Sequence, residues 1–269
     1  MDLTGRSALL TGATGGLGRA TAEALAGRGA HVILSSRKAT ELEKIAAALP
    51  GKGHATAPAD LAEPGAAEQL AADAVDLGDV DILIANAGLP GTGRMEDLSV
   101  EEINSGLRVN LEAPIQLAKA LAPAMKERGS GHLVFVASLS GKAASPRSSI
   151  YNATKFGLRG FALALRMDLH GSGVGVSIVS PGFIRDAGMF ANSGAKPPPG
   201  FGTSSPEQVA EGVLRAIDRD KAEVAVAPLR QRAMSHFALF SPGLSGRAQS
   251  GSAGQKAAAA VADGHKKRA

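Results

Sequence analysis

The chain has 269 residues, 44% of them hydrophobic, which is sufficient for one α/β domain with a single core. It has no cysteine, which excludes a disulfide framework, a thiolate nucleophile and cysteine-ligated zinc, and favours the reducing cytoplasm. Of the formal charge of +4, a net +3 belongs to residues 250–269, which contain four cations and one aspartate, and aromatic residues are only 3% of the chain. This pattern argues against a nucleic-acid partner.

The six histidines are scattered, with no pair at the spacing of two ligands on one helix or turn, so we expect no metal site. The first residues do not form a basic region followed by an apolar stretch. No apolar run reaches the roughly 18 residues needed to cross a bilayer. We therefore expect neither secretion nor a membrane span.

Short apolar runs alternate with segments of helical spacing from the start of the chain. The predicted strands are residues 7–11, 31–35, 54–57, 80–85, 132–137 and 174–179. The predicted helices, with Ala, Leu and Ile at helical spacing, include residues 19–28, 39–49, 65–77 and 206–216. This alternation predicts a doubly wound α/β domain, a mostly parallel sheet with helices on both faces and right-handed crossovers.

The last third of the chain is interrupted by residues of low apolar content. Residues 186–205 are rich in Gly, Ser and Pro and predict a long loop. After Val226 a short apolar segment, 234–239, precedes a stretch rich in Gly, Ser, Ala and Lys. We expect one domain over residues 1–240, with a substrate loop at about 183–205, and a flexible tail over residues 241–269.

A glycine-rich turn follows the first predicted strand and opens the first predicted helix. Glycines there allow the backbone to approach a pyrophosphate, while the helix N-terminus directs its N–H groups and partial positive charge at the anion. Such a stretch can also be an ordinary loop, but its position between strand and helix favours phosphate binding. Its spacing is G-x-x-x-G-x-G rather than the commoner G-x-G-x-x-G. The expected cofactor contacts are Gly12, Thr14, Gly15, Gly16, Leu17 and Gly18.

The second strand ends at Ser36 and Arg37, about 20 residues past the glycines, where an NAD site carries an acid for the ribose 2′-hydroxyl. Ser36 is small, and Arg37 can place its guanidinium against a 2′-phosphate. The alternative is a solvated arginine at a helix start. The pair favours NADP(H), with NAD(H) as the second choice.

Tyr151 and Lys155 are four residues apart in a predicted helix, so both side chains can reach one site. A lysine ammonium beside a phenol is expected to lower the phenol pKa and make it a usable proton donor and acceptor. By itself the spacing also fits a core tyrosine with a solvated lysine. However, Tyr151 is the only tyrosine in the chain, and Ser138 follows a predicted strand, where its hydroxyl could bind a substrate oxygen.

From about residue 5 to about residue 230 the chain resembles the short-chain dehydrogenase/reductase family. The shared residues, in the family's order, are Thr11–Gly18, Asp60, Asn86–Ala87–Gly88, Asn110, Ser138, Tyr151, Lys155 and Pro181–Gly182. The resemblance implies a Rossmann fold with a seven-stranded sheet. It implies that Asp60, with Leu61, meets the adenine, that Asn86, Ala87 and Gly88 lie beside the cofactor, and that Pro181, Gly182 and Ile184 contact it. It also implies that Lys155 binds the nicotinamide ribose and that Asn110 holds a water in a relay to Lys155.

Three positions depart from the family pattern. Ala85 stands where a second asparagine is frequent, and Asp186 replaces the threonine that contacts the nicotinamide amide. An aspartate there could accept from that amide. Gly15 stands where many NADP-preferring members have a basic residue, so the 2′-phosphate preference would rest on Arg37, with help from Lys38.

These features predict an NADP(H)-dependent oxidoreductase that interconverts a carbonyl and an alcohol, with Ser138, Tyr151, Lys155 and Asn110 as the catalytic set. The large side chains of the loop predict a hydrophobic ketone or aldehyde, although they could instead pack on the domain or on a neighbouring subunit. They are Phe183, Ile184, Met189, Phe190 and Phe201. The alternatives are an NAD-linked alcohol dehydrogenase, a non-catalytic dinucleotide sensor or scaffold, and a dehydratase or epimerase of the extended branch, which the short chain after Pro206 disfavours. A homodimer or homotetramer is expected.

Overall fold

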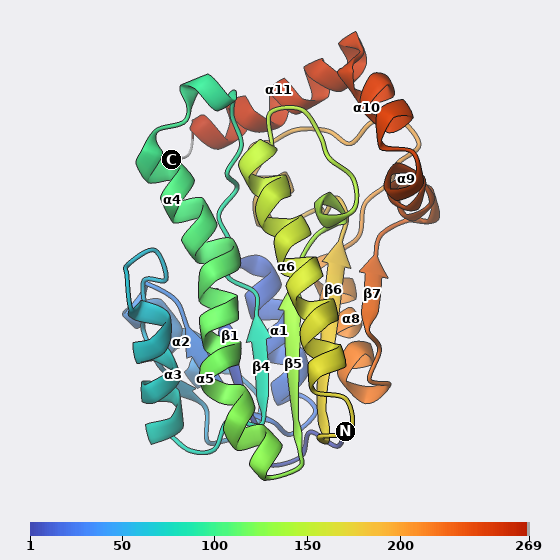
Figure 1. Ribbon diagram of the computed structural model, residues 1–269. Coiled ribbons are helices and arrows are strands. Elements are labelled where there is room, and N and C mark those ends of the chain that lie inside the picture. Colours follow the sequence, from blue (N-terminus) through green and yellow to red (C-terminus); the bar gives the residue numbers. More distant parts are fainter. Residues whose placement is uncertain (268–269) are drawn as a thin grey trace.

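The computed structural model describes residues 1–267, and its centre is a seven-stranded parallel sheet in the order β3-β2-β1-β4-β5-β6-β7 (Figure 1). The strands are β1 Ser7–Thr11, β2 His31–Ser35, β3 Ala55–Thr56, β4 Ile82–Ala85, β5 Gly131–Val136, β6 Val174–Pro181 and β7 Glu223–Val226. The predicted doubly wound α/β fold is confirmed. β1 pairs with both β2 and β4, so the strand order reverses beside it, and in such sheets this switch point is where ligands bind.

Helices cover both faces of the sheet. They are α1 Gly16–Ala26, α2 Ala39–Ala48, α3 Ala66–Asp76, α4 Val100–Leu107, α5 Ala113–Glu127, α6 Ser149–Asp168, α7 Gly188–Ser193, α8 Pro206–Asp218, α9 Leu229–Phe240, α10 Pro242–Ser250 and α11 Ser252–Lys266. Short turns are η1 Met95–Asp97, η2 Arg108–Glu112 and η3 Leu139–Gly141, of which η2 is π-helical. None of the helices in residues 1–267 combines the length and apolarity needed to traverse a bilayer.

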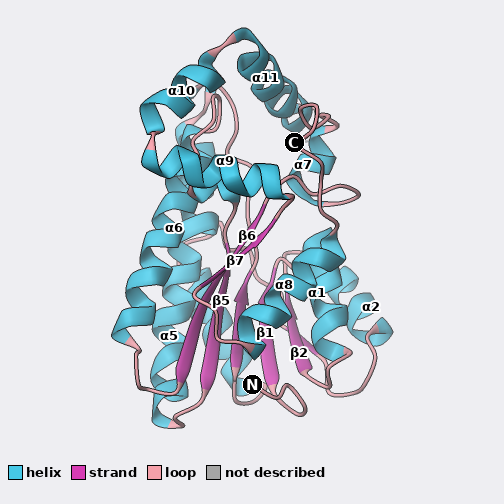
Figure 2. Ribbon diagram, turned by 90° about the vertical axis from the view of Figure 1, so that its right-hand side faces the viewer, coloured by secondary structure: helices cyan, strands magenta, loops and turns pink. Residues whose placement is uncertain are grey.

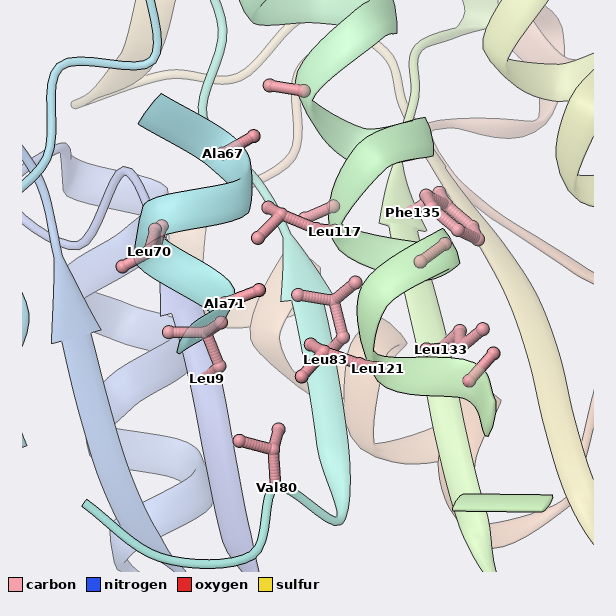
Figure 3. Close-up of a cluster of buried hydrophobic side chains, with 14 of the residues drawn as sticks. Leu9, Ala67, Leu70, Ala71, Val80, Leu83, Leu117, Leu121, Leu133 and Phe135 are labelled. Carbon is pink, nitrogen blue, oxygen red and sulfur yellow. The ribbon is translucent and has the colours of Figure 1, made fainter. Parts of the chain in front are cut away.

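Side chains alternate between two buried clusters because successive residues of a strand point to opposite faces. Leu9, Leu83 and Leu133 point to one face, where they pack with α3, α5 and α6 (Figure 3). Their strand neighbours, such as Leu10 and Ile84, pack with α1, α2 and α8 on the other face. The five inner strands are therefore buried on both sides, which explains their continuous apolar runs in the sequence, whereas the edge strands β3 and β7 are only partly buried.

The expected flexible tail is corrected by the structure, since residues 242–250 and 252–266 form α10 and α11. Residues 257–260 are all alanine, the residue type with the highest intrinsic helix propensity. Ala262, in the same helix, is buried. α11 packs against α7, and a Cβ on Gly264 would overlap the backbone of Ser193. Figure 2 shows α11 and α7 close together at the end of the molecule where the strands terminate. A composition typical of a mobile tail thus also fits a helix that docks through small residues.

Candidate active site

The glycine-rich turn lies between β1 and α1, with its backbone close to the end of β4. Gly12 has φ +68°, and a Cβ there would lie 2.9 Å from the Cα of Ala87. A Cβ on Gly18 would overlap the Gly12 carbonyl, so a larger residue at either position would displace the turn. α1 begins at Gly16 and has no side chain capping its N-terminus, so its first N–H groups can bind an anion. This turn therefore fits the pyrophosphate of a dinucleotide.

Thr11 and Asn86 join the ends of β1 and β4 at the switch point. The Thr11 Oγ1 accepts hydrogen bonds from the N–H groups of Asn86 and Ala87, each at 3.0 Å. In return, the Asn86 Nδ2 donates to the carbonyls of Thr11 (3.0 Å) and Gly12 (3.3 Å). Asn86 thus holds the glycine-rich turn against β4, while Thr11, to which the sequence assigned no separate role, supplies the reciprocal acceptor.

Arg37 and Asp60 lie beside each other at the carboxyl ends of β2 and β3, with 3.8 Å between Arg37 Nη1 and Asp60 Oδ2. The Asp60 Oδ1 also accepts from the N–H of Ala62 at 3.0 Å. Arg37 is about two-thirds exposed, and the Ser36 Oγ accepts from the N–H of Lys38. A hollow of about 670 Å³ opens here between these residues and α4, and Glu63 and Glu101 also line it. Its lining includes Arg37, Asp60, Ala62, Asn104, Ser105 and Arg108.

Ser138, Tyr151 and Lys155 come together at the carboxyl end of β5. Ser138 follows β5, and Tyr151 and Lys155 are one turn apart on α6. The Lys155 Nζ lies 5.7 Å from the centroid of the Tyr151 ring and donates to the carbonyl of Val136 at 3.0 Å. The structure therefore brings Ser138 to the pair on α6 that the spacing of Tyr151 and Lys155 predicts.

Burial dominates the electrostatics of this group. It raises the pKa of Tyr151 above its ordinary value, an effect that the nearby Ser138 hydroxyl partly offsets. Burial also lowers the pKa of Lys155 to about 8. The expectation that Lys155 lowers the Tyr151 pKa is corrected here, because Lys155 is directed to the Val136 carbonyl and desolvation of the phenol prevails.

Asn110 is fully buried within the π-helical turn η2, an irregularity that is frequent at functional sites. Its Oδ1 accepts from the N–H of Leu89 at 2.7 Å, and its Nδ2 donates to the Leu89 carbonyl at 2.9 Å and toward the Thr154 Oγ1 at 3.4 Å. Asn110 therefore clamps the segment after β4 against α6. A Cβ on Gly88 would lie 3.3 Å from the Asn110 Oδ1 and 3.9 Å from the Lys155 Nζ, so Asn110 and Lys155 flank the same glycine.

Comparison with known proteins agrees with this geometry. A family model described as short chain dehydrogenase matches residues 6–198. The chain belongs to the short-chain dehydrogenase/reductase family. The ketoacyl reductase HetN of Nostoc sp. is 38% identical over 227 residues, which cover 83% of this chain and 79% of the relative. The dehydrogenase/reductase SDR family member 7B of Bos taurus is 33% identical over 253 residues, or 88% of this chain and 78% of the relative.

Solved structures show the same relationship. A structure described as a putative betaketoacyl-ACP reductase has a TM-score of 0.74 and 30% identity, and the alignment covers 84% of this chain and 97% of that one. A short-chain dehydrogenase from Sphingobium yanoikuyae in complex with NADPH has a TM-score of 0.75 and 27% identity, with coverage of 91% and 94%. The present chain is accordingly an NAD(P)-dependent dehydrogenase/reductase.

In this short-chain dehydrogenase/reductase, Asn152 links α6 to the turn that carries Ser138. Its Nδ2 donates to the carbonyls of Ser140 (2.7 Å) and Ala143 (3.2 Å), and its Oδ1 accepts from the N–H of Ser145 at 3.2 Å. The sequence did not point to Asn152, because an asparagine next to Tyr151 has no pattern of its own. Its three partners become neighbours only when the loop folds back on α6.

The segment after β6 forms another wall of the site. Gly182 donates its N–H to the carbonyl of Val226, and Ile184 is buried beside Ser204. Asp186, at the position of the family's threonine, has φ +67° and pairs with Arg185 at 3.2 Å. Its side chain is 71% exposed, so in this structure its carboxylate is engaged with Arg185 in a solvent-facing position.

His265 of α11 bridges two sides of the site. One ring nitrogen, Nδ1, lies 2.7 Å from the Thr92 Oγ1, and the other, Nε2, lies 2.8 Å from the carbonyl of Met189 on α7. A lone histidine in an Ala- and Lys-rich segment gave no signal of this role. α11 therefore holds the segment after β4 and the substrate loop together.

Proposed function

We propose that this chain is an NADP(H)-dependent reductase of hydrophobic ketones or aldehydes, with Ser138, Tyr151 and Lys155 as its catalytic residues. The observation that carries the proposal is their grouping at the carboxyl end of β5, with Lys155 5.7 Å from the Tyr151 ring, on the same edge of the sheet as the glycine-rich turn. A bound nicotinamide supplies the hydride in reduction and accepts it in oxidation.

The chain's own residues handle the proton and the substrate oxygen. Tyr151 donates its phenolic proton to the carbonyl oxygen, a proton that a phenol retains at neutral pH. Ser138 donates a hydrogen bond to the same oxygen and stabilises the negative charge that develops there. Lys155 supplies a buried positive charge beside the phenol and would bind the nicotinamide ribose. Asn110 keeps the segment containing Gly88 in place next to Lys155.

Two features support the choice of cofactor. Arg37 stands where an acid would select NAD, and its guanidinium is about two-thirds exposed and held only by a 3.8 Å contact to Asp60. It can therefore turn toward a 2′-phosphate at little cost, since exposed ion pairs contribute about 0–1 kcal/mol. Asp60 and Leu61 would meet the adenine, and Ile184 with Pro181 and Gly182 would border the nicotinamide.

The walls of the loop support an apolar substrate. The Phe183 ring lies 4.5 Å from the Phe190 ring and 6.4 Å from the Phe201 ring, so the loop carries an aromatic cluster. Asp186, beside Arg185 at 3.2 Å, offsets the charge of that cation locally. Such a surface binds alkyl groups at roughly 0.8 kcal/mol per buried methylene.

The test is a series of 2-alkanones of increasing chain length, with consumption of NADPH and NADH followed by nicotinamide absorbance. We expect NADPH to be used preferentially and kcat/KM to rise from short to medium chains. A preference for NADH, or better turnover of a charged ketone with a flat alkanone series, would contradict the proposal. Tyr151→Phe is the matched inactive control.

Assembly through α6 forms part of the proposal. Phe156 and Met167 on this helix are 40% and 72% exposed, which suits burial against a second copy in a homodimer or homotetramer. Light scattering after gel filtration would measure the mass. A monomer at micromolar concentration would contradict this part alone.

A further inference from the structure

Helix α9 has its amphipathicity reversed. Gln231, Ser235 and Ala238 face the body of the protein and are buried. With 3.6 residues per turn, Leu229, Phe237 and Phe240 fall within about 80° of one another on the opposite side, and they are 78%, 50% and 86% exposed. A helix of a soluble domain ordinarily shows the reverse pattern, because the apolar side faces the core. The exposed face of α9 therefore needs a partner.

The apolar surface continues across the corner into α10. Leu244 is 58% exposed and follows Phe240 by four residues, with Pro242 beginning the second helix. Together Leu229, Met234, Phe237, Phe240 and Leu244 form what we call the α9–α10 ridge. Phe240, the most exposed of them, stands at the corner between the helices, so the ridge protrudes there and does not form a groove.

The segment that carries the ridge has charged side chains of one sign. Residues 224–262 contain no aspartate or glutamate but four cations, Arg230, Arg232, Arg247 and Lys256. Arg230 and Arg232 flank the apolar side of α9, one on each side of it. Within residues 1–267 none of these four cations forms an ion pair; Arg230 instead lies over the Phe201 ring at 5.0 Å.

We propose that the α9–α10 ridge docks this chain on the surface of an anionic lipid bilayer. Exposed Phe and Leu side chains flanked by Arg and Lys are what an interfacial helix presents to anionic headgroups. A second copy fits poorly, because a two-fold contact would set these cations against their own copies with no acid between them. A protein helix would need a groove, whereas the ridge protrudes at Phe240.

The ridge is mechanically connected to the substrate loop. On the buried side of α9, the Gln231 Nε2 donates to the carbonyls of Phe201 and Gly202, and its Oε1 accepts from the N–H of Phe183. Figure 2 shows α9 across the end of the sheet, at the tips of β6 and β7, where this loop begins. Docking would therefore bring the aromatic loop close to the bilayer, where apolar substrates partition.

The test is flotation of the purified full-length chain with vesicles of phosphatidylcholine alone or with added phosphatidylglycerol. We expect binding to the anionic vesicles and at least about tenfold weaker binding after Phe240→Ser with Leu244→Ser, since each removes a large exposed side chain. Arg232→Gln with Arg247→Gln should reduce binding only to the anionic vesicles. Two matched controls alter exposed residues elsewhere and should leave vesicle binding unchanged. They are Leu77→Ser for the apolar side chains, and Lys52→Gln with Lys126→Gln for the charge.

Four outcomes would overturn the docking proposal, three of them in the experiment above. The first is failure of the wild-type chain to float with anionic vesicles, and the second is an equal loss of vesicle binding in the control variants. The third is a fall in oligomer mass in Phe240→Ser with Leu244→Ser, which would make the ridge a contact between copies. Capture of an acidic carrier protein without vesicle binding would also overturn it. The measurement needs no turnover, so its failure would leave the proposed reductase function standing.

Discussion

The ammonium of Lys155 lies 5.7 Å from the centre of the Tyr151 ring and donates to the carbonyl of Val136 at 3.0 Å. Lys155 is thus anchored to Val136, the last residue of β5. Val136 lies two residues before Ser138 in the chain. This contact couples the position of α6 to β5, the strand that Ser138 follows. It also places a buried cation beside a partly buried phenol.

Removal of the phenolic hydroxyl should separate chemistry from binding. We expect Tyr151→Phe to lower kcat at least ~10²-fold, because it removes the transferable proton, while the dissociation constant for NADPH stays within a few-fold. Stopped-flow turnover and fluorescence titration measure the two quantities. Near-normal turnover of the variant would refute the role of Tyr151.

Arg37 should determine the preference between the two dinucleotides. Arg37→Ala is expected to weaken NADPH binding by about 1.5–3 kcal/mol, the scale of a hydrogen bond to a charged group, and to leave NADH nearly unaffected. Calorimetric titration with both dinucleotides tests this. Arg28→Ala, which removes another exposed arginine paired with Asp218, is the control and should change neither affinity.

The buried ammonium of Lys155 should make stability depend on pH. Its pKa is about 8 in the folded chain, against an ordinary value of 10.5, so between these values the unfolded chain binds more protons. The free energy of unfolding should therefore rise as the pH increases from about 8 to about 10.5. Urea unfolding of the wild type and of Lys155→Met across this range measures it. The difference in unfolding free energy between the two should itself change with pH, and a constant difference would contradict the prediction.

Asn152 should act as a positioning residue for Ser138. Asn152→Ala leaves the Ser140 and Ala143 carbonyls and the Ser145 N–H without their partner, which we expect to cost about 1–3 kcal/mol of stability. Because the loop then loosens, kcat should fall while the KM for NADPH changes little. Denaturant unfolding and steady-state kinetics test both. An unchanged kcat in a destabilised variant would mean that Asn152 serves stability alone.

Much of the fold was predictable because the five inner strands are buried on both faces. Apolar runs such as 7–11 and 31–35 have no other stable place in a chain of this size, and the helices between them follow the ordinary 3.6-residue spacing. The cofactor turn was predictable for a similar reason, since its glycines are required by local backbone geometry. Ser138, Tyr151 and Lys155 could be named because their order and spacing resemble a family pattern.

What the sequence alone determined were features that depend on near neighbours in the chain: strand and helix periodicity, the glycine turn, and the spacing of Tyr151 and Lys155. Only the tertiary structure decided that Asn152 holds the Ser138 turn, that His265 bridges Thr92 and Met189, and that α9 exposes its apolar side. It also decided the pKa directions of Tyr151 and Lys155. These properties depend on which distant segments meet and on how much water they exclude, and neither is encoded in local spacing.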